Sequence, residues 1–172
     1  FWATEPALIG GARATAEAAR TRGLEGLGPD EIERRQPATS SLAADPAAQR
    51  FLDAAVQSTP GMAEASFTDA NGITGGAAGP ADDLVQSDEP WWREVRDYGR
   101  WIGSPMAPAE GGGPLLPMAF RIDGDQGQPI GVLLHGGQER RRGRHVRRAD
   151  LREQLLQLTA AAAEAVLLGT LL

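Results

Sequence analysis

The sequence predicts an α+β domain built on a five-stranded antiparallel sheet. Two segments rich in turn-forming residues each join two apolar stretches of strand-like composition, which predicts two hairpins. Helical patterns stand at both ends of the chain and once in the middle, so helices and strands do not alternate regularly. With 172 residues, the chain is long enough for one domain with its own core.

The N-terminal part of the chain is predicted to be helical. Between Thr4 and Arg22 apolar residues recur at helical spacing, although Gly10 and Gly11 interrupt the pattern at a cost of about 1 kcal/mol each. Two shorter helices follow, each starting where a proline stands beside an acidic residue, over residues 29–36 and 45–59.

The middle of the chain is predicted to form the sheet. Asn71-Gly72 favours a tight hairpin turn between the first two strands, and residues 123–129 have turn chemistry throughout. Acidic residues and Pro90 at the front of residues 88–95 predict a helix between the second and third strands. The predicted strands cover residues 63–68, the segment from Ile73 onward, and residues 101–104, 115–122 and 130–134.

The composition shifts sharply after Gly136-Gly137. An arginine-rich run over Arg140–Arg148 is followed from Asp150 by an apolar segment that predicts a C-terminal helix. The run is interpreted as a solvated connection, with binding of anionic lipid or nucleic acid as the alternative. The expected organisation is an N-terminal helical region (1–36), a single core (37–137) and a basic connector with the C-terminal helix (138–172).

Composition excludes several classes of function. The net charge of -6 argues against nucleic-acid binding, and the absence of cysteine excludes disulfides and thiolate metal sites. No apolar stretch reaches the roughly 20 residues that cross a bilayer. Because the chain starts at Phe1 without a signal segment, we expect it to be a piece excised from a longer protein.

Three motifs occur in order along the predicted sheet. They are Phe67–Ile73 (FTDANGI), Ser87–Trp92 (SDEPWW) and Pro129–Leu133 (PIGVL), and Asp30–Glu33 precedes them. Together they resemble the Cache family of extracellular sensor domains, over roughly residues 31–134. The resemblance implies a PAS-like fold in which the N-terminal helix takes the place of the family's long leading helix.

The resemblance also implies a function. Such domains are the periplasmic or extracellular portions of inner-membrane receptors, and they pass ligand binding to a histidine kinase, cyclase or chemotaxis output module. Family members commonly hold an amino acid, carboxylate or similar metabolite between the sheet and the loop-helix region that covers it. This chain departs from the pattern at Glu89, where amino-acid binders carry arginine, and at Arg121, where the family usually has proline.

The predicted ligand site lies around the central helix and the third strand, where most large aromatic side chains cluster. Adjacent residues on a helix point about 100° apart, so one of Trp91 and Trp92 can seal the core while the other lines a pocket; in the alternative, both pack the helix onto the sheet. The predicted ligand-binding residues are Trp91, Trp92, Tyr98, Trp101, Asp88, Met118, Phe120 and Arg121.

Several of these residues have a second interpretation. Asp88 either receives a ligand ammonium or caps the helix start. Met118 and Phe120 either line the pocket or belong to the core, and Arg121 either replaces the missing cation or points to solvent.

No catalytic, metal or cofactor site is predicted. His135 and His145 lie at or beyond the end of the last predicted strand, too isolated for a triad or a zinc site. Turn and cap roles explain the carboxylates better than acid–base or calcium chemistry, and Gly111–Gly113 has no phosphate-loop lysine after it.

We therefore expect a non-catalytic sensor domain that binds a small molecule, with no cofactor and no nucleic acid. It is expected to dimerise through the N-terminal helix and to meet the membrane only through helices outside this chain. The two rivals are an enzyme and an interaction domain whose pocket is filled by its own side chains.

Overall fold

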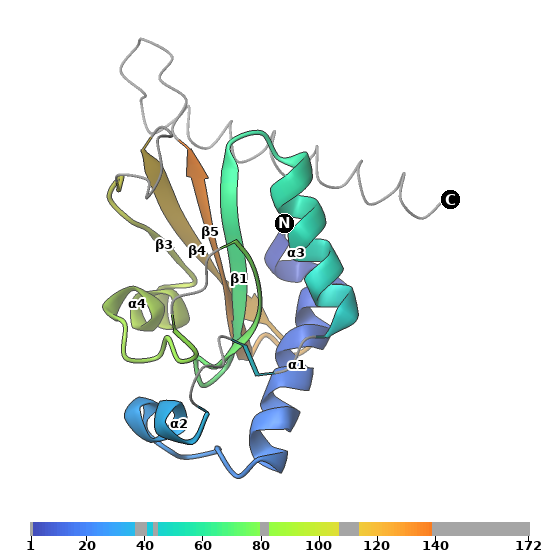
Figure 1. Ribbon diagram of the computed structural model, residues 1–172, viewed down its shortest axis with the longest axis vertical. Helices are drawn as coiled ribbons and strands as arrows, with labels where there is room; N and C mark the ends of the chain where they lie inside the picture. The colour runs from blue at the N-terminus through green and yellow to red at the C-terminus, as the bar shows by residue number, and fades with distance from the viewer. Residues whose placement is uncertain (1, 37–40, 43–44, 80–82, 107–113, 139–172) are drawn as a thin grey trace.

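The fold is a five-stranded antiparallel sheet with helices on both faces (Figure 1). The computed structural model describes the chain except for residues 1, 37–40, 43–44, 80–82, 107–113 and 139–172. Its elements are, in order, the 3-10 turn η1 (Trp2–Thr4), α1 (Pro6–Thr21), α2 (Pro29–Arg35), α3 (Pro46–Ser58), β1 (Met62–Asp69), β2 (Thr74–Ala78), α4 (Pro90–Tyr98), β3 (Arg100–Ile102), β4 (Leu115–Asp123) and β5 (Pro129–Gln138).

The strand order is β2-β1-β5-β4-β3, so β5, the last strand in sequence, lies in the centre. β1 and β2 form one hairpin and β4 and β5 form the other, as the turn chemistry predicted. At the first turn, Asp69 Oδ1 accepts from the backbone N-H of Asn71 and of Ile73, and Gly72 takes a φ of 82°. The predicted α+β fold class with its five-stranded antiparallel sheet is confirmed.

The two faces of the sheet are covered differently. We call them the α1/α3 face and the α4 face after the helices that pack on each (Figure 1). Leu8 and Ala12 of α1, and Phe51 and Leu52 of α3, join Phe67 of β1 in the largest buried cluster. On the other face a single nine-residue helix, α4, packs against β3, β4 and β5.

Local chemistry explains the helix starts. In the described part of the chain, each of the four α-helices begins at a proline. The fixed φ of proline suits the first helical position, where a backbone N-H would have no partner within the helix, so the missing N-H costs nothing. Asp45 caps α3 by accepting from the N-H groups of Ala47 and Ala48 at 2.9 Å each. The N-terminal helix begins at Pro6 and not at Thr4, because Trp2–Thr4 forms a 3-10 turn before it.

The last strand is longer than its sequence pattern predicted. β5 runs to Gln138, because Gly136 and Gly137 still pair with both β1 and β4. His135 therefore lies inside the central strand and is 4% exposed, which corrects its expected place at or beyond the strand end. In the sequence, Gly136 and Gly137 suggest the end of the strand. Strand pairing needs only backbone N-H and carbonyl groups, so the strand continues through them.

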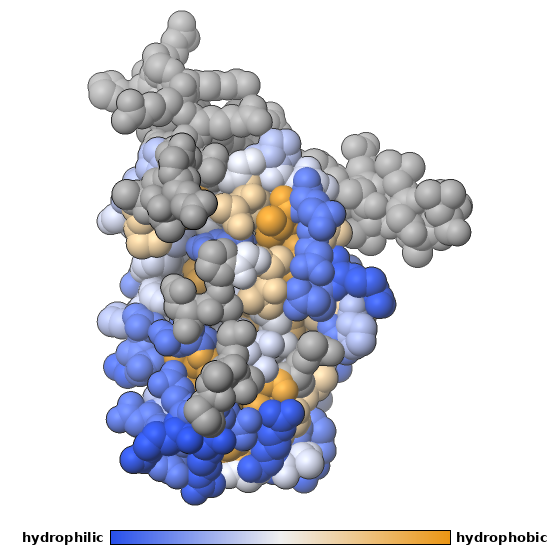
Figure 2. Space-filling view, in the orientation of Figure 1, coloured by the Kyte–Doolittle hydropathy of each residue, from blue (hydrophilic) through white to orange (hydrophobic). Residues whose placement is uncertain are grey.

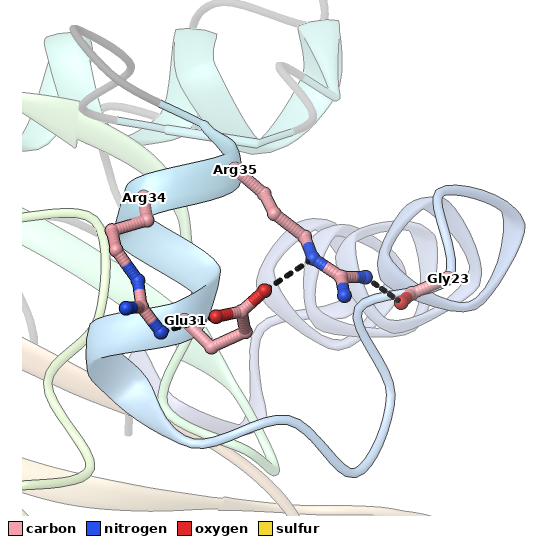
Figure 3. A network of polar contacts seen from close by, with 4 residues as sticks. All are labelled: Gly23, Glu31, Arg34 and Arg35. Atoms are coloured by element: carbon pink, nitrogen blue, oxygen red, sulfur yellow. Dashed lines mark hydrogen bonds and ion pairs between the residues drawn. The ribbon is translucent and has the colours of Figure 1, made fainter.

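α2 closes one end of the molecule. Ile32 packs with Ala19, Leu24, Leu42 and other residues in a second buried cluster. Figure 3 shows how the helix is tied to the turn after α1. Glu31 pairs with Arg34 and Arg35 within α2, and Arg35 Nη1 donates to the carbonyl of Gly23 at 3.4 Å. Hydrophilic residues gather over this end in Figure 2. Exposed pairs of this kind contribute little to stability because water and salt screen them, so burial of Ile32 matters more.

Three features expected from the sequence lie outside the described residues. They are the glycine loop at 111–113, the arginine-rich run at 140–148 and the C-terminal helix from Asp150.

The neighbouring glycines of α1 are expected to respond oppositely to alanine. A Cβ on Gly11 would lie 2.7 Å from Ala48 Cβ and from Phe67 Cζ, whereas a Cβ on Gly10 would meet nothing within 4 Å. Gly10→Ala should raise the free energy of unfolding by about 0.5–1 kcal/mol through helix propensity, and Gly11→Ala should lower the melting temperature. Thermal unfolding of the two variants checks this, and equal shifts would contradict the close approach of α1 to α3.

Candidate functional site

A row of residues crosses all five strands on the α4 face. Each stands directly opposite the next in the strand register: Ala77 of β2, Ser66 of β1, Leu134 of β5, Ala119 of β4 and Trp101 of β3. The alternation of side chains along a strand puts all of them on one face. We call these five residues the cross-strand row. Its side chains are small or medium-sized up to the indole at the β3 end.

α4 is anchored beside this row by a buried tryptophan. Trp92 is 2% exposed and packs with Val95, Ala119 and Val132. Its Nε1-H donates to Thr68 Oγ1 at 3.0 Å, which satisfies the polar end of the buried indole. Trp92 therefore fixes the helix on the sheet.

Trp91 takes a different position from its neighbour. It is half-buried and packs against Trp101 with ring centroids 5.9 Å apart and the ring planes tilted by 36°. The two adjacent tryptophans thus take different positions: Trp92 lies in the core, and Trp91 lies beside the β3 end of the cross-strand row. This is the first of the two arrangements that the sequence left open.

Arg121 is held by groups of its own chain. Its Nε donates to Asp123 Oδ1 at 2.7 Å, and its Nη1 donates to the carbonyl of Arg96 at 3.1 Å in the last turn of α4. The side chain is 26% exposed. A guanidinium at a helix C-terminus satisfies an otherwise unpaired carbonyl, so Arg121 ties α4 to β4. A ligand carboxylate would have to compete with Asp123 for it.

The remaining predicted residues do not gather beside the cross-strand row. Met118 and Phe120 alternate with Ala119 and belong to the buried cluster of the α1/α3 face. Tyr98 is 79% exposed at the end of α4, and Asp88 is exposed before its start. The structure therefore brings together Trp91, Trp92 and Trp101 from the predicted set, with Arg121 on the same face.

Sequence reasoning missed a polar site in the core. His135 lies between Trp2 and Phe120, with ring centroids 5.5 and 5.8 Å away, and its Nδ1 is buried without a hydrogen-bond partner. Burial lowers the pKa of His135 to about 4, so the ring is neutral at pH 7. The alternation of Leu133 and His135 was the available signal, but it was hidden by the expected strand end.

Asp69 is a second buried ionisable group among the residues that the structure describes, and its role is structural. Burial raises the pKa of this carboxyl, and the backbone N-H groups of Ile73 and Asn71 that bind it lower the pKa in part. Both N-H groups belong to the hairpin turn. Asp69 thus shapes the turn, as expected from its position in the sequence.

The described part of the chain holds no group of three or more histidine, cysteine, aspartate or glutamate side chains placed to bind a metal ion. None of the helices within the same residues has the length and apolar character needed to span a bilayer.

Comparisons with known proteins give likenesses of fold. No protein-family model and no curated protein matches the chain. Similar solved structures include the extracellular domain of a histidine kinase, at 19% identity and a TM-score of 0.45, covering 76% of this chain and 56% of that one. A GAF sensor protein from Burkholderia vietnamiensis has 17% identity and a TM-score of 0.47, with 90% and 89% covered.

A third similar structure is the ligand-binding domain of the Campylobacter jejuni chemoreceptor Tlp3 in complex with 4-methylisoleucine. It has 15% identity and a TM-score of 0.43, and the match covers 76% of this chain and 56% of that one. At these identities and TM-scores the likenesses carry no conclusion about function, which must rest on this chain's own residues.

Acid is expected to destabilise the fold through His135. Its pKa is about 4 in the folded chain, against the ordinary value of 6.5. Between these values the unfolded chain binds the proton more readily, so stability falls as the pH drops from 6.5 to 4, by about 3 kcal/mol in total. Urea unfolding at pH 7, 5.5 and 4.5, followed by tryptophan fluorescence, measures the loss.

The matched variant is His135→Phe, which keeps a flat ring between Trp2 and Phe120. The raised pKa of Asp69 acts in the opposite direction, but it is common to both proteins and cancels in their difference. The difference should grow with acidity. Parallel stability curves for the two proteins would contradict a buried neutral His135.

Proposed function

We propose that this chain is the extracytoplasmic ligand-sensing domain of a bacterial signal-transduction receptor, and that it binds a small metabolite on the α4 face of its sheet. The receptor type that follows from the motif resemblance is a histidine kinase, cyclase or chemoreceptor. The domain itself is proposed to be non-catalytic. Its ligand class is an amino acid, carboxylate or similar metabolite, and its place is the periplasmic or extracellular side of the inner membrane.

The observation that carries the proposal is the difference between the two faces. On the α1/α3 face, two long helices bury Phe67, Leu133 and their neighbours in the main core. On the α4 face, one short helix packs on β3, β4 and β5. The cross-strand row beside it ends at Trp101, which packs against Trp91 of the helix, and both indoles are half-buried. Indole rings offer a flat apolar surface with one polar N-H, which suits a small polar ligand.

α4 connects the proposed binding surface to the rest of the domain. α4 is joined to the sheet at both ends: Trp92 binds Thr68 on β1, and Arg121 on β4 binds the last turn. A ligand beside Trp91 therefore contacts an element that is coupled to two strands. A ligand changes the balance between two conformations of the domain only as far as it binds one of them more tightly than the other.

The binding test is a thermal-shift screen of the chain against amino acids, small carboxylates, amines and purines. A ligand at 100 times its Kd should stabilise the fold by about 2.7 kcal/mol. The shift should be lost in Trp101→Ala and kept in Ile102→Ala, a matched control on the same strand whose side chain is 47% exposed and points to the other face.

Two results would contradict the proposal. A shift that survives Trp101→Ala unchanged would place the ligand elsewhere. No shift with any class would favour the rival function, an interaction domain without a small-molecule ligand, and turnover of a panel compound would favour the enzyme.

Homodimerisation is proposed to run through the N-terminal helix. α1 turns Gly10, Arg13 and Glu17 outward while Leu8 and Ala12 are buried. A glutamate at Gly10 should therefore weaken the dimer measured by sedimentation equilibrium, and Gln126→Glu in an exposed turn should not. A chain that stays monomeric at all concentrations would contradict this part.

A further inference from the structure

The η1 turn covers a histidine in the central strand of the sheet. The backbone of His135 pairs with Ala65 on β1 and with Met118 on β4, so both neighbouring strands hold it. Its ring stacks on Phe120, with centroids 5.8 Å apart and an angle of 16° between the planes, and the indole of Trp2 packs against it at 5.5 Å. Because Trp2 belongs to η1, this turn covers the ring from outside the sheet.

The contact between η1 and the sheet leaves two polar atoms unpaired. His135 Nδ1 and Trp2 Nε1 are both buried, and neither has a hydrogen-bond partner among the described residues. A buried polar atom that forms no hydrogen bond lowers the stability of the state that buries it. Water would reach both atoms if Trp2 moved away. The closed position of η1 is therefore less stable, relative to an open one, than its apolar contacts alone would make it.

Opening at η1 breaks fewer interactions than opening within the sheet. η1 is three residues long, and Glu5 donates its N-H to the carbonyl of Trp2 at 2.9 Å. Trp2 is only partly buried and meets Phe51 of α3 edge to face, with ring centroids 6.1 Å apart. To expose His135 from the other side, β5 would have to separate from β1 or β4, with which it pairs along its length. Short segments of this kind can open while the rest of the fold stays intact.

Burial, and not a charged neighbour, sets the protonation of His135. It lowers the pKa of the imidazole to about 4, and burial alone causes this shift. η1 has no ionisable side chain. The ionisable side chains on the other elements around His135 are Glu5, Arg13, Glu17 and Arg20 at the N-cap and along α1, Arg50 and Asp53 on α3, Glu64 and Asp69 on β1, and Arg121 and Asp123 on β4.

We propose that η1 is an acid-released cap: when His135 takes up a proton, Trp2 leaves its ring and the strands stay paired. A charged imidazolium donates through both ring nitrogens, and water reaches them most readily at the place that η1 covers. η1 leads directly into α1, so its release frees the N-terminal end of that helix. The cap gives the domain a response to acid on the α1/α3 face, opposite to the proposed ligand surface.

The size of the response follows from the two protonation states. In the open form the hydrated imidazole has its ordinary pKa of 6.5, and in the closed form its pKa is about 4. Between these values the open form binds the proton more readily, so opening increases as the pH falls through 6.5. From pH 7 to pH 5 the equilibrium constant for opening should rise about 20-fold while the closed form remains the majority.

Cysteine labelling measures the opening directly, because the chain has no cysteine of its own. Three variants carry one each: Ala3→Cys in η1 and Ala55→Cys in α3, both at buried positions, and Gln126→Cys in an exposed turn. Each reacts with 4,4′-dithiodipyridine at pH 7 and pH 5, and the rate for Gln126→Cys corrects for the effect of pH on the reagent. The corrected rate for Ala3→Cys should rise about 20-fold in acid. It should exceed the rate for Ala55→Cys at least about tenfold.

Two further variants connect the opening to His135. His135→Phe keeps a flat ring at this position and should remove the acid-dependent rise in the Ala3→Cys rate. Trp2→Ala removes the cover and should move the titration midpoint of His135 upward, from about 4 toward 6.5. The NMR signal of the imidazole Cε1-H follows this titration, so the second measurement stands even where His135→Phe folds poorly.

Four results would overturn the proposal. Equal rates for Ala3→Cys and Ala55→Cys would mean that the whole domain opens and that η1 is not a separate cap. An Ala3→Cys rate that ignores pH, or that rises equally with His135→Phe, would remove His135 as the trigger. An unchanged titration midpoint in Trp2→Ala would show that η1 does not keep His135 uncharged. The metabolite screen tests the ligand surface separately from all of these.

Discussion

The pairing of β5 between β1 and β4 is the constraint on which the rest of the structure depends. Leu133 and His135 point to the α1/α3 face, and Val132 and Leu134 point to the α4 face. A slip of one residue would exchange these sets and place a histidine where a leucine packs. The register of β5 thus decides which side chains of β1 and β4 lie on each face of the sheet. It thereby determines which residues form the core and which form the proposed binding surface.

The two faces of the sheet differ in the size of the side chains that they carry. The α1/α3 face carries Phe67, Leu133 and Phe120, which fill the space under two helices. The cross-strand row on the α4 face consists of smaller side chains up to Trp101, and only a nine-residue helix packs there. Glycines allow close packing on both faces. Gly11 lets α1 approach Ala48 of α3 and Phe67 of β1, and Gly136 leaves room for the side chain of Glu64.

The sequence was sufficient for the fold class, the order of the elements and both hairpins, because turn residues and side-chain periodicity are local signals. It placed His135 wrongly because Gly136 and Gly137 pair through their backbone alone, which no side-chain pattern records. Part of the geometry of the candidate site could be predicted, because the tryptophans that pack together there also lie close to one another in the sequence. That Met118 and Phe120 face away from Trp101 depends on the strand register, and the partners of Arg121 come from α4 and β4 together.

Whether the α4 face binds the ligand is best decided by a crystal structure of the chain with a compound selected by the metabolite screen. We expect electron density on the α4 face, beside Trp91 and Trp101 and over the cross-strand row, with the α1/α3 core unchanged. Density between the sheet and α1 or α3, or a ligand held only by exposed residues outside the α4 face, would show that the α4 face is not the binding surface.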